Sequence, residues 1–465
     1  MTAHSHHPER RQLFRALKWP LLLVLLAGGL VWWKWAYLRL GAEGYVFAYP
    51  LVIMDITREN SAITLGPTNA LHRVRQFPRP EFKDVVRPNV DTLYSVAFMD
   101  LSAGPLVLEM PVNNERYEVL PLMDAWTHVF ASLGTRTTGT QGGRYLIAGP
   151  SWQGAAPQGM TVLKSSTALV WLIGRTQTQG PADYPVVHKL QDGLQLRPWS
   201  ATRDVAQAAP SADSTQATQT TPPLPPVIQM RQMGTRDLFN RFTSLMVANP
   251  PRPDDATMLN RLAGIGVVTG QPVTWSWLEQ AAVKTGRWLA DFKIAQELKK
   301  PRQLVNGWST PPRSLGNYGT DYNVRAVVAM IGLGANLPED AMYPVAQVDA
   351  TGAALNGSHA YRLHFAASEL PPVQAFWSVT AYGPDDALID NPEHRYALGS
   401  MSPLVRNTDG SVDLWIQAQP PADAWRHNWL PVQANAGFVL NARLYWPSTE
   451  ALEGRWHMPA LERLP

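Results

Sequence analysis

The 465-residue sequence contains no cysteine. This absence excludes disulfide scaffolds, cysteine nucleophiles, thiolate zinc sites and iron–sulfur clusters together. Any metal site would therefore need histidine and carboxylate ligands. The histidines of the body form neither a His-x-His nor a His-Glu-x-x-His pattern, so we predict no metal site from local spacing. A site assembled from distant histidines is the alternative.

Three common functional signatures are also missing. The sequence has no Gly-x-Ser-x-Gly elbow, no phosphate-binding Gly-x-x-x-x-Gly-Lys and no dinucleotide fingerprint between a strand and a helix. These absences disfavour serine hydrolases, nucleotide-dependent enzymes and nicotinamide oxidoreductases, and they leave the cofactor unknown. The net charge of +3 arises at the N-terminus, because residues 41–465 hold 34 basic and 36 acidic side chains. We therefore expect no nucleic-acid partner.

The N-terminal segment predicts that the protein is anchored in a membrane. Residues 19–33 form a 15-residue apolar run behind four basic residues, and Trp32, Trp33, Trp35 and Tyr37 follow at the far end. Such a run, extended to residue 38 by Lys34 and the aromatic residues, predicts a single-pass inner-membrane anchor. Residues 1–40 would then be cytoplasmic tail and anchor, with the body in the periplasm. A cleaved export signal is the alternative, although bulky residues follow the glycines where cleavage would need small ones.

The remaining chain alternates between two kinds of pattern. Residues 41–60 predict an amphipathic helix bent at Pro50. Short alternating runs separated by turns predict a β-domain over residues 41–200 and a second one over residues 341–465. Between them lie a Pro/Gln/Thr-rich linker or loop at 201–228 and a helical region at 229–340. The predicted fold is mainly β with a helical insert: two antiparallel, sandwich- or barrel-like domains bridged by α-helices, plus an N-terminal membrane helix.

The most informative polar segment runs from Val86 to Ser95. Arg87, Asn89, Asp91 and Tyr94 gather at the expected start of a strand, where they could bind a polar ligand or supply an acid/base pair. The alternative is that Asn89 and Asp91 only cap a turn through Asx hydrogen bonds.

A second segment places Asp124, Trp126 and His128 at a spacing of two residues. On one strand these side chains would share a face, which either lines a cavity or faces solvent. Arg325 lies one turn into an expected helix capped by Thr320 or Asp321, where capping and an interdomain ion pair are the alternative to ligand binding.

Several blocks resemble a bacterial tandem-domain family. Asn69 with His72, then residues 87–94, 149–152 and 173–175, resemble domain of unknown function 1254. Residues 319–326, 376–382, 390–396, 409–411, 428–431 and 443–445 resemble its companion, domain of unknown function 1214. The resemblance implies two antiparallel β-domains bridged by helices in an exported homo-oligomer, and it implies no reaction. The anchor and the 201–226 stretch depart from the family pattern.

Two functions follow as hypotheses. The first is an enzyme or binder that acts on a small, partly apolar organic molecule by acid/base chemistry. Asp91 would be the base, His128 the proton shuttle with Asp124 beside it, and Arg87 or Arg325 the anion stabiliser. Asn89, Tyr94 and Trp126 would complete the ligand contacts. The alternative is a non-enzymatic, membrane-tethered scaffold of the periplasm.

Overall fold

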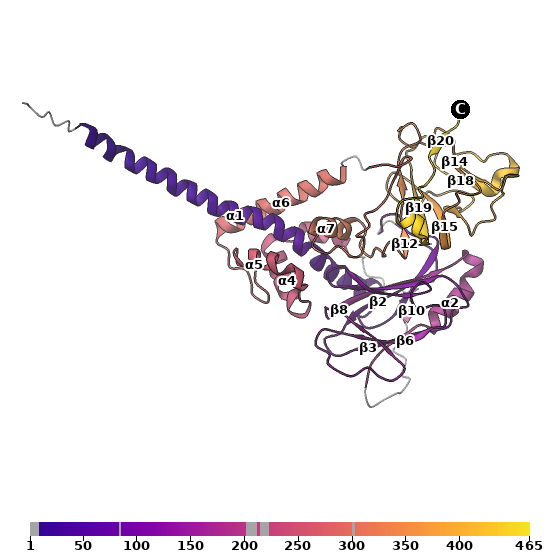
Figure 1. Cartoon of the computed structure of the whole chain (residues 1–465), viewed down its shortest axis with the longest axis horizontal. Helices are drawn as coiled ribbons and strands as arrows, with labels where there is room; N and C mark the ends of the chain where they lie inside the picture. Colours follow the sequence, from indigo (N-terminus) through magenta and orange to yellow (C-terminus); the bar gives the residue numbers. More distant parts are fainter. Residues whose placement is uncertain (1–8, 83–84, 201–211, 214–222, 300–302) are drawn as a thin grey trace, which may run out of the picture. The chain divides into compact units, whose positions relative to one another are not determined.

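The computed structural model describes residues 9–82, 85–200, 212–213, 223–299 and 303–465, with side chains from residue 34 onward except 212–213, 297 and 299. The chain forms two compact units (Figure 1). Of the described residues, the helical unit comprises 9–49, 233–247 and 253–299, and the β unit comprises 50–82, 85–200, 212–213, 223–232, 248–252 and 303–465. Each unit is therefore assembled from segments that are far apart in the sequence.

The helical unit is built on the first helix, α1 (Glu9–Thr64), which also continues into the β unit. It packs with α4 (Thr235–Ala248), α5 (Ala256–Ala263) and α6 (Trp277–Lys299), and a short 3₁₀ helix, η2 (Pro253–Asp255), precedes α5. Phe47 meets Phe242 edge to face, with ring centroids 5.9 Å apart. Glycine allows close approach, since a Cβ on Gly44 would lie 2.8 Å from Leu262.

The N-terminal β-domain consists of two sheets. The six-stranded sheet has the order β10-β1-β2-β8-β4-β5 and the four-stranded sheet the order β7-β6-β3-β9. In chain order the strands are β1 (His72–Arg73), β2 (Thr92–Asp100), β3 (Leu106–Met110), β4 (Glu118–Asp124), β5 (Val129–Gly134), β6 (Gly143–Ala148), β7 (Thr161–Lys164), β8 (Leu169–Gln177), β9 (Gln195–Pro198) and β10 (Ala212–Asp213). Side chains of both sheets, such as Leu172 and Leu108, form one core. Helix α2 (Tyr184–Gly193), preceded by the 3₁₀ turn η1 (Pro181–Asp183), connects β8 to β9.

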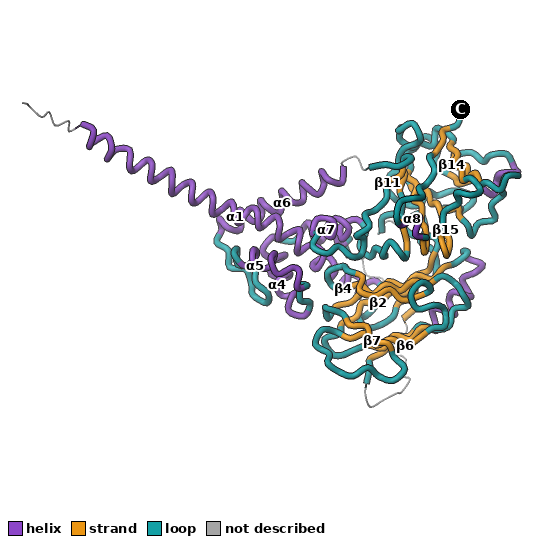
Figure 2. Tube along the Cα trace, in the orientation of Figure 1, coloured by secondary structure: helices purple, strands orange, loops and turns teal. Residues whose placement is uncertain are grey.

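The C-terminal β-domain repeats this plan (Figure 2). One sheet has the order β11-β13-β19-β15-β16, with β12 also paired to β19, and the other has the order β18-β17-β14-β20. Its strands are β11 (Trp308–Ser309), β12 (Ala341–Met342), β13 (Val345–Ala346), β14 (Tyr361–Phe365), β15 (Val373–Tyr382), β16 (Ala397–Gly399), β17 (Val412–Gln417), β18 (Trp429–Pro431), β19 (Val439–Pro447) and β20 (Leu461–Arg463). Both sheets contribute to a shared core, for example through Leu414 and Val379.

The remaining helices of the β unit are short. They are α3 (Pro226–Gln232), α7 (Tyr322–Ile331), α8 (Thr449–Leu452) and the 3₁₀ helix η3 (Asp423–Asn428). Asp321 caps α7, because its carboxylate accepts a hydrogen bond from the backbone N–H of Val324 at 3.1 Å. This is one of the two caps that the sequence predicted.

The β-rich architecture agrees with the alternating sequence patterns, with two corrections. The pairs β1–β10, β6–β7 and β17–β18 are parallel, so the described sheets are not purely antiparallel. Helix α2 was not predicted inside the N-terminal β region.

Two predicted segments are described only in part. Of the linker predicted at 201–228, residues 201–211 and 214–222 lie outside the described residues; the described parts are β10 and residues 223–228, which include the start of α3. The predicted membrane segment, residues 19–38, belongs to α1, but its side chains are described only from Lys34 onward. Within the described part of the chain, no helix has the length and apolar character needed to cross a bilayer.

Candidate functional site

The turn before β2 is organised by Asn89. Its side-chain oxygen accepts hydrogen bonds from the backbone N–H groups of Asp91 (2.6 Å) and Thr92 (3.2 Å). This is the Asx turn that the sequence suggested as an alternative. The Asn89 amide is not only a turn element, because its Nδ2 donates to the Tyr445 hydroxyl at 2.9 Å. The turn therefore reaches the C-terminal β-domain.

The carboxylate of Asp91 bridges the two β-domains. Its Oδ2 accepts hydrogen bonds from Ser378 Oγ on β15 (2.7 Å) and from Tyr445 Oη on β19 (2.9 Å). Asp91 is 7% exposed, and both hydroxyl partners are buried. Burial, with the Asp91 charge nearby, raises the pKa of Tyr445 well above its usual value, so this hydroxyl stays a donor. The arrangement places the Asp91 carboxylate between two fixed hydroxyl donors.

A buried arginine adds a second connection between the domains. Arg443 on β19 donates to the Tyr382 hydroxyl (2.6 Å) and to the backbone carbonyl of Arg87 (3.0 Å), while Tyr382 Oη donates to the Pro88 carbonyl at 2.7 Å. Burial alone would lower the pKa of Arg443, but the neighbouring tyrosines and Asp91 raise it, so it remains a cation. The side chain of Arg87 points elsewhere and pairs with Asp386 at 2.8 Å.

Tyr94 belongs to a neighbouring chain of contacts. The Arg175 guanidinium lies 5.2 Å from the Tyr94 ring centroid and donates to the Asn336 amide oxygen at 2.5 Å. Asn336 in turn donates to the Tyr343 hydroxyl at 2.6 Å. These contacts lead from β2 towards the β12–β13 connection of the C-terminal domain.

The prediction of one strand through Asp124, Trp126 and His128 is wrong. Strand β4 ends at Asp124 and β5 begins at Val129, with a tight turn between them. Thr127 has a φ of 71°, a left-handed conformation that breaks the extended chain. Asp124 closes the turn, because its Oδ1 accepts from the backbone N–H groups of Trp126 and His128, both at 2.9 Å.

The turn nevertheless gathers the residues that the sequence singled out. His128 lies between two guanidinium groups, with Nδ1 3.3 Å from Arg252 and Nε2 3.4 Å from Arg325. Arg325 is fully buried and lies 5.2 Å from the Trp126 ring centroid. One cluster therefore contains Asp124, Trp126, His128 and Arg325 together with Arg252, which was not among the predicted site residues.

The electrostatics of this cluster keep His128 neutral. Burial and the two arginines lower the pKa of His128 to about 3. Burial raises the pKa of Asp124 to about 6, against the opposing effect of the hydrogen bonds and arginines. A neutral imidazole has only one bare ring nitrogen, so one guanidinium at a time can donate to it. At neutral pH, His128 is thus an acceptor for arginine and has no proton to deliver as an imidazolium.

The predicted site residues therefore form two groups. The group around Asp91 takes its partners from β15 and β19, whereas the group around His128 takes them from Arg252, Tyr318 and α7. Within the described part of the chain, no cluster of three or more histidine, aspartate and glutamate side chains could hold a metal ion.

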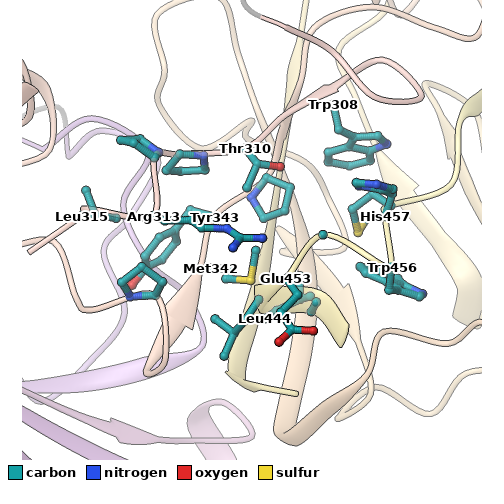
Figure 3. Close-up of a pocket in the computed structure, with 18 of the residues that line it drawn as sticks. Trp308, Thr310, Arg313, Leu315, Met342, Tyr343, Leu444, Glu453, Trp456 and His457 are labelled. Carbon is teal, nitrogen blue, oxygen red and sulfur yellow. The ribbon is translucent and has the colours of Figure 1, made fainter. Parts of the chain in front are cut away.

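A pocket of about 500 Å³ lies in the C-terminal domain, where the sequence predicted none (Figure 3). Trp308, Trp456 and His457 line one side, Leu315 and Tyr343 the other, and the guanidinium of Arg313 lies between them. The lining comes from residues 303–315, 338–344, 444 and 451–458. No local motif marks such a set, so the sequence offered no signal for it.

The aromatic walls of the pocket are fixed by hydrogen bonds. Trp308 Nε1 donates to the Pro459 carbonyl (2.7 Å), and Trp456 Nε1 donates to the Glu369 carbonyl (3.0 Å). Tyr343 is shared by the pocket and the chain of contacts that leads to Tyr94. The pocket thus has an apolar, pre-formed interior and a few polar groups, the usual character of a small-molecule site.

Comparison with known proteins agrees with this architecture. The VPA0106 protein from Vibrio parahaemolyticus superimposes with a TM-score of 0.70 over 92% of this chain and 100% of that chain, at 22% identity, which shows a shared fold. A protein from Burkholderia cenocepacia gives a TM-score of only 0.43 at 14% identity, over 95% of each chain. No curated protein sequence matches the chain. Residues 68–198 match the family described as protein of unknown function DUF1254, and residues 340–449 match the family described as protein of unknown function DUF1214. The chain therefore belongs to the proteins that join an N-terminal DUF1254 domain to a C-terminal DUF1214 domain.

Proposed function

We propose that this protein is a membrane-anchored envelope protein whose C-terminal domain binds a small, partly apolar organic molecule. The observation that carries the proposal is the 500 Å³ pocket with its two tryptophans, Trp308 and Trp456. Its volume falls within the range of ordinary ligand sites, and aromatic walls with few polar groups suit a compact apolar body with one polar end.

The polar end of the ligand would meet Arg313 and His457. Within the described residues, neither side chain makes a hydrogen bond or an ion pair, whereas the nearby Glu453 accepts from Arg455 at 2.9 Å. A guanidinium with unused donors in a partly apolar pocket suits a carboxylate or another planar acceptor.

The hydrogen bonds, positions and pKa values of the predicted catalytic groups favour binding over acid/base catalysis. The Asp91 carboxylate is engaged by Ser378 and Tyr445, and neither Asp91 nor His128 lines the pocket. A pKa of about 3 also keeps His128 neutral near pH 7, so it cannot act as an imidazolium proton donor.

The anchoring part of the proposal rests on the N-terminal sequence. The apolar run at 19–33, the basic residues before it and the tryptophans after it are typical of a helix that spans the inner membrane with its basic end inside. The ligand would then come from the periplasm.

The test is thermal melting of the full chain in detergent against a panel of organic acids, esters, sugars and aromatic compounds. A ligand at 100 times its Kd stabilises the folded state by about 2.7 kcal/mol. We expect the shift to vanish in Trp456→Ala and to weaken in Arg313→Gln.

Two matched variants serve as controls. Trp425→Ala removes a half-buried tryptophan, and Arg406→Gln an exposed arginine; neither residue lines the pocket. Both should keep the shift. No shift with any compound, or a shift that persists in the pocket variants, would contradict the proposal and favour a tethered scaffold without a ligand.

A further inference from the structure

The first turn of α6 is an exposed aromatic feature that the proposed function does not use. Trp277 is 77% exposed, the largest value among the exposed apolar side chains described, and Leu278 beside it is also exposed. Trp35 on α1 is 59% exposed. Exposed large apolar side chains that lie together, as Trp277 and Leu278 do in sequence, are typical of a contact surface.

The position of this turn along α1 is fixed by packing. A Cβ on Gly286 would lie 2.1 Å from the Leu38 carbonyl oxygen, and a Cβ on Gly41 would lie 2.8 Å from the Val283 Cα, so the two helices touch through glycine. Further along, the Tyr45 hydroxyl donates to Asp291 at 2.7 Å. From the Lys34–Glu279 ion pair to the Tyr45–Asp291 hydrogen bond, the contact positions increase on both helices, so α6 runs roughly parallel to α1.

An ion pair also joins the first turn of α6 to α1 near the end of the apolar run. Lys34 lies 3.6 Å from Glu279, and both side chains are mostly buried. Glu279 also closes a capping box, because its carboxylate accepts from Ser276 N–H (2.8 Å) and its own N–H donates to Ser276 Oγ (3.4 Å). Counting back from the backbone contacts of Gly286 with Leu38 and of Val283 with Gly41 places Trp277 level with residues 29 to 35 of α1, which is within about 8 Å of Lys34 along the axis at 1.5 Å per residue.

We infer that the first turn of α6 is a second membrane contact, with Trp277 and Leu278 seated in the headgroup region beside Trp35. The inference rests on the proposed anchor, whose apolar run ends one residue before Lys34. Tryptophan is the residue that prefers this region of a bilayer. In the headgroup region the charges of Lys34 and Glu279 would neutralise each other, because the two side chains form an ion pair.

Phe292 provides an internal control for the geometry. Its side chain on the same helix is 52% exposed. It lies about 21 Å further along the helix axis than Leu278. The polar layer on one side of a bilayer is only about 5–8 Å thick. With an ordinary helix tilt of about 20°, Phe292 should remain in water.

The absence of native cysteine makes a site-directed label unambiguous. Four single variants of the full chain, Leu26→Cys, Leu278→Cys, Phe292→Cys and Val247→Cys, would carry a nitroxide in phospholipid nanodiscs. Collision with oxygen and with a water-soluble nickel chelate then measures depth. We expect the label at 26 in hydrocarbon, the label at 278 at the interface, and the labels at 292 and 247 in water.

The outcomes separate the two proposals. A label at 26 in hydrocarbon with the label at 278 in water would overturn the second contact and leave the anchor intact. A label at 26 in water would overturn both. Spin–spin broadening at 278 without interfacial depth would place a second copy of the chain on this surface and would also overturn the inference.

Discussion

The carboxylate of Asp91 should contribute strongly to stability, because it joins the two β-domains. Asp91→Ala removes the acceptor of two buried hydroxyl donors, Ser378 and Tyr445, and hydrogen bonds to a charged group contribute about 1.5–3 kcal/mol each. It also removes a carboxylate charge that raises the pKa of the buried Arg443. Tyr445 keeps its bond from Asn89, which offsets part of the loss. We expect the free energy of unfolding to fall by about 3–5 kcal/mol.

The assay is urea denaturation of the full chain in detergent, followed by tryptophan fluorescence. A double-mutant cycle with Ser378→Ala should show a coupling energy of about 0.5–3 kcal/mol, because the two side chains share a hydrogen bond. Asp423→Ala, which alters an exposed carboxylate of η3, is the control and should change stability by less than about 0.5 kcal/mol. An unchanged midpoint for Asp91→Ala, or additive effects in the cycle, would refute this account of the domain contact.

Two further perturbations test the helix contact and the buried histidine. Gly286→Ala should destabilise the chain by about 1–3 kcal/mol in thermal melts, because the new Cβ would overlap the Leu38 carbonyl, whereas alanine usually improves a helix; Thr285→Ala, on the exposed face, should be nearly neutral. His128 has a folded pKa of about 3, below its ordinary 6.5, so its contribution is complete above pH 6.5 and declines as the pH falls towards 3, by up to about 1.4 kcal/mol per unit. The stability difference between wild type and His128→Asn should therefore shrink on acidification; the raised pKa of Asp124 acts in the opposite direction but is present in both proteins. A difference independent of pH would contradict the assigned environment.

Local patterns predicted the strands well. Residues 360–365 alternate in the way a half-buried strand requires, and β14 lies there with buried and partly buried side chains in turn. Residues 92–99 coincide with β2, whose side chains are nearly all buried. Runs of two to four residues, such as β1 and β7, carry too little pattern to be recognised. Helix α2 was missed because it is short and lies within a segment rich in strands.

The candidate site was harder to predict, because its partners are remote in sequence. Asp91 was recognised from its own segment, but its donors lie 287 and 354 positions away. The break after Asp124 depends on a left-handed threonine, a conformation for which a sequence normally supplies glycine or asparagine. The pocket requires four segments to meet, so no single stretch could reveal it.

The helical unit is assembled from segments far apart in the sequence, and this affects how it folds during translation. Tyr45 and Phe47 are completely buried, yet Tyr45 bonds to a residue 246 positions later and Phe47 packs on α4. At about 5–20 residues per second, translation would take roughly 12–50 seconds to supply that partner. The N-terminal β-domain is complete in sequence before α4 is made, so it can form first. The apolar face of α1 must stay uncovered through that interval, which makes the nascent chain dependent on protection from aggregation until α6 has been synthesised.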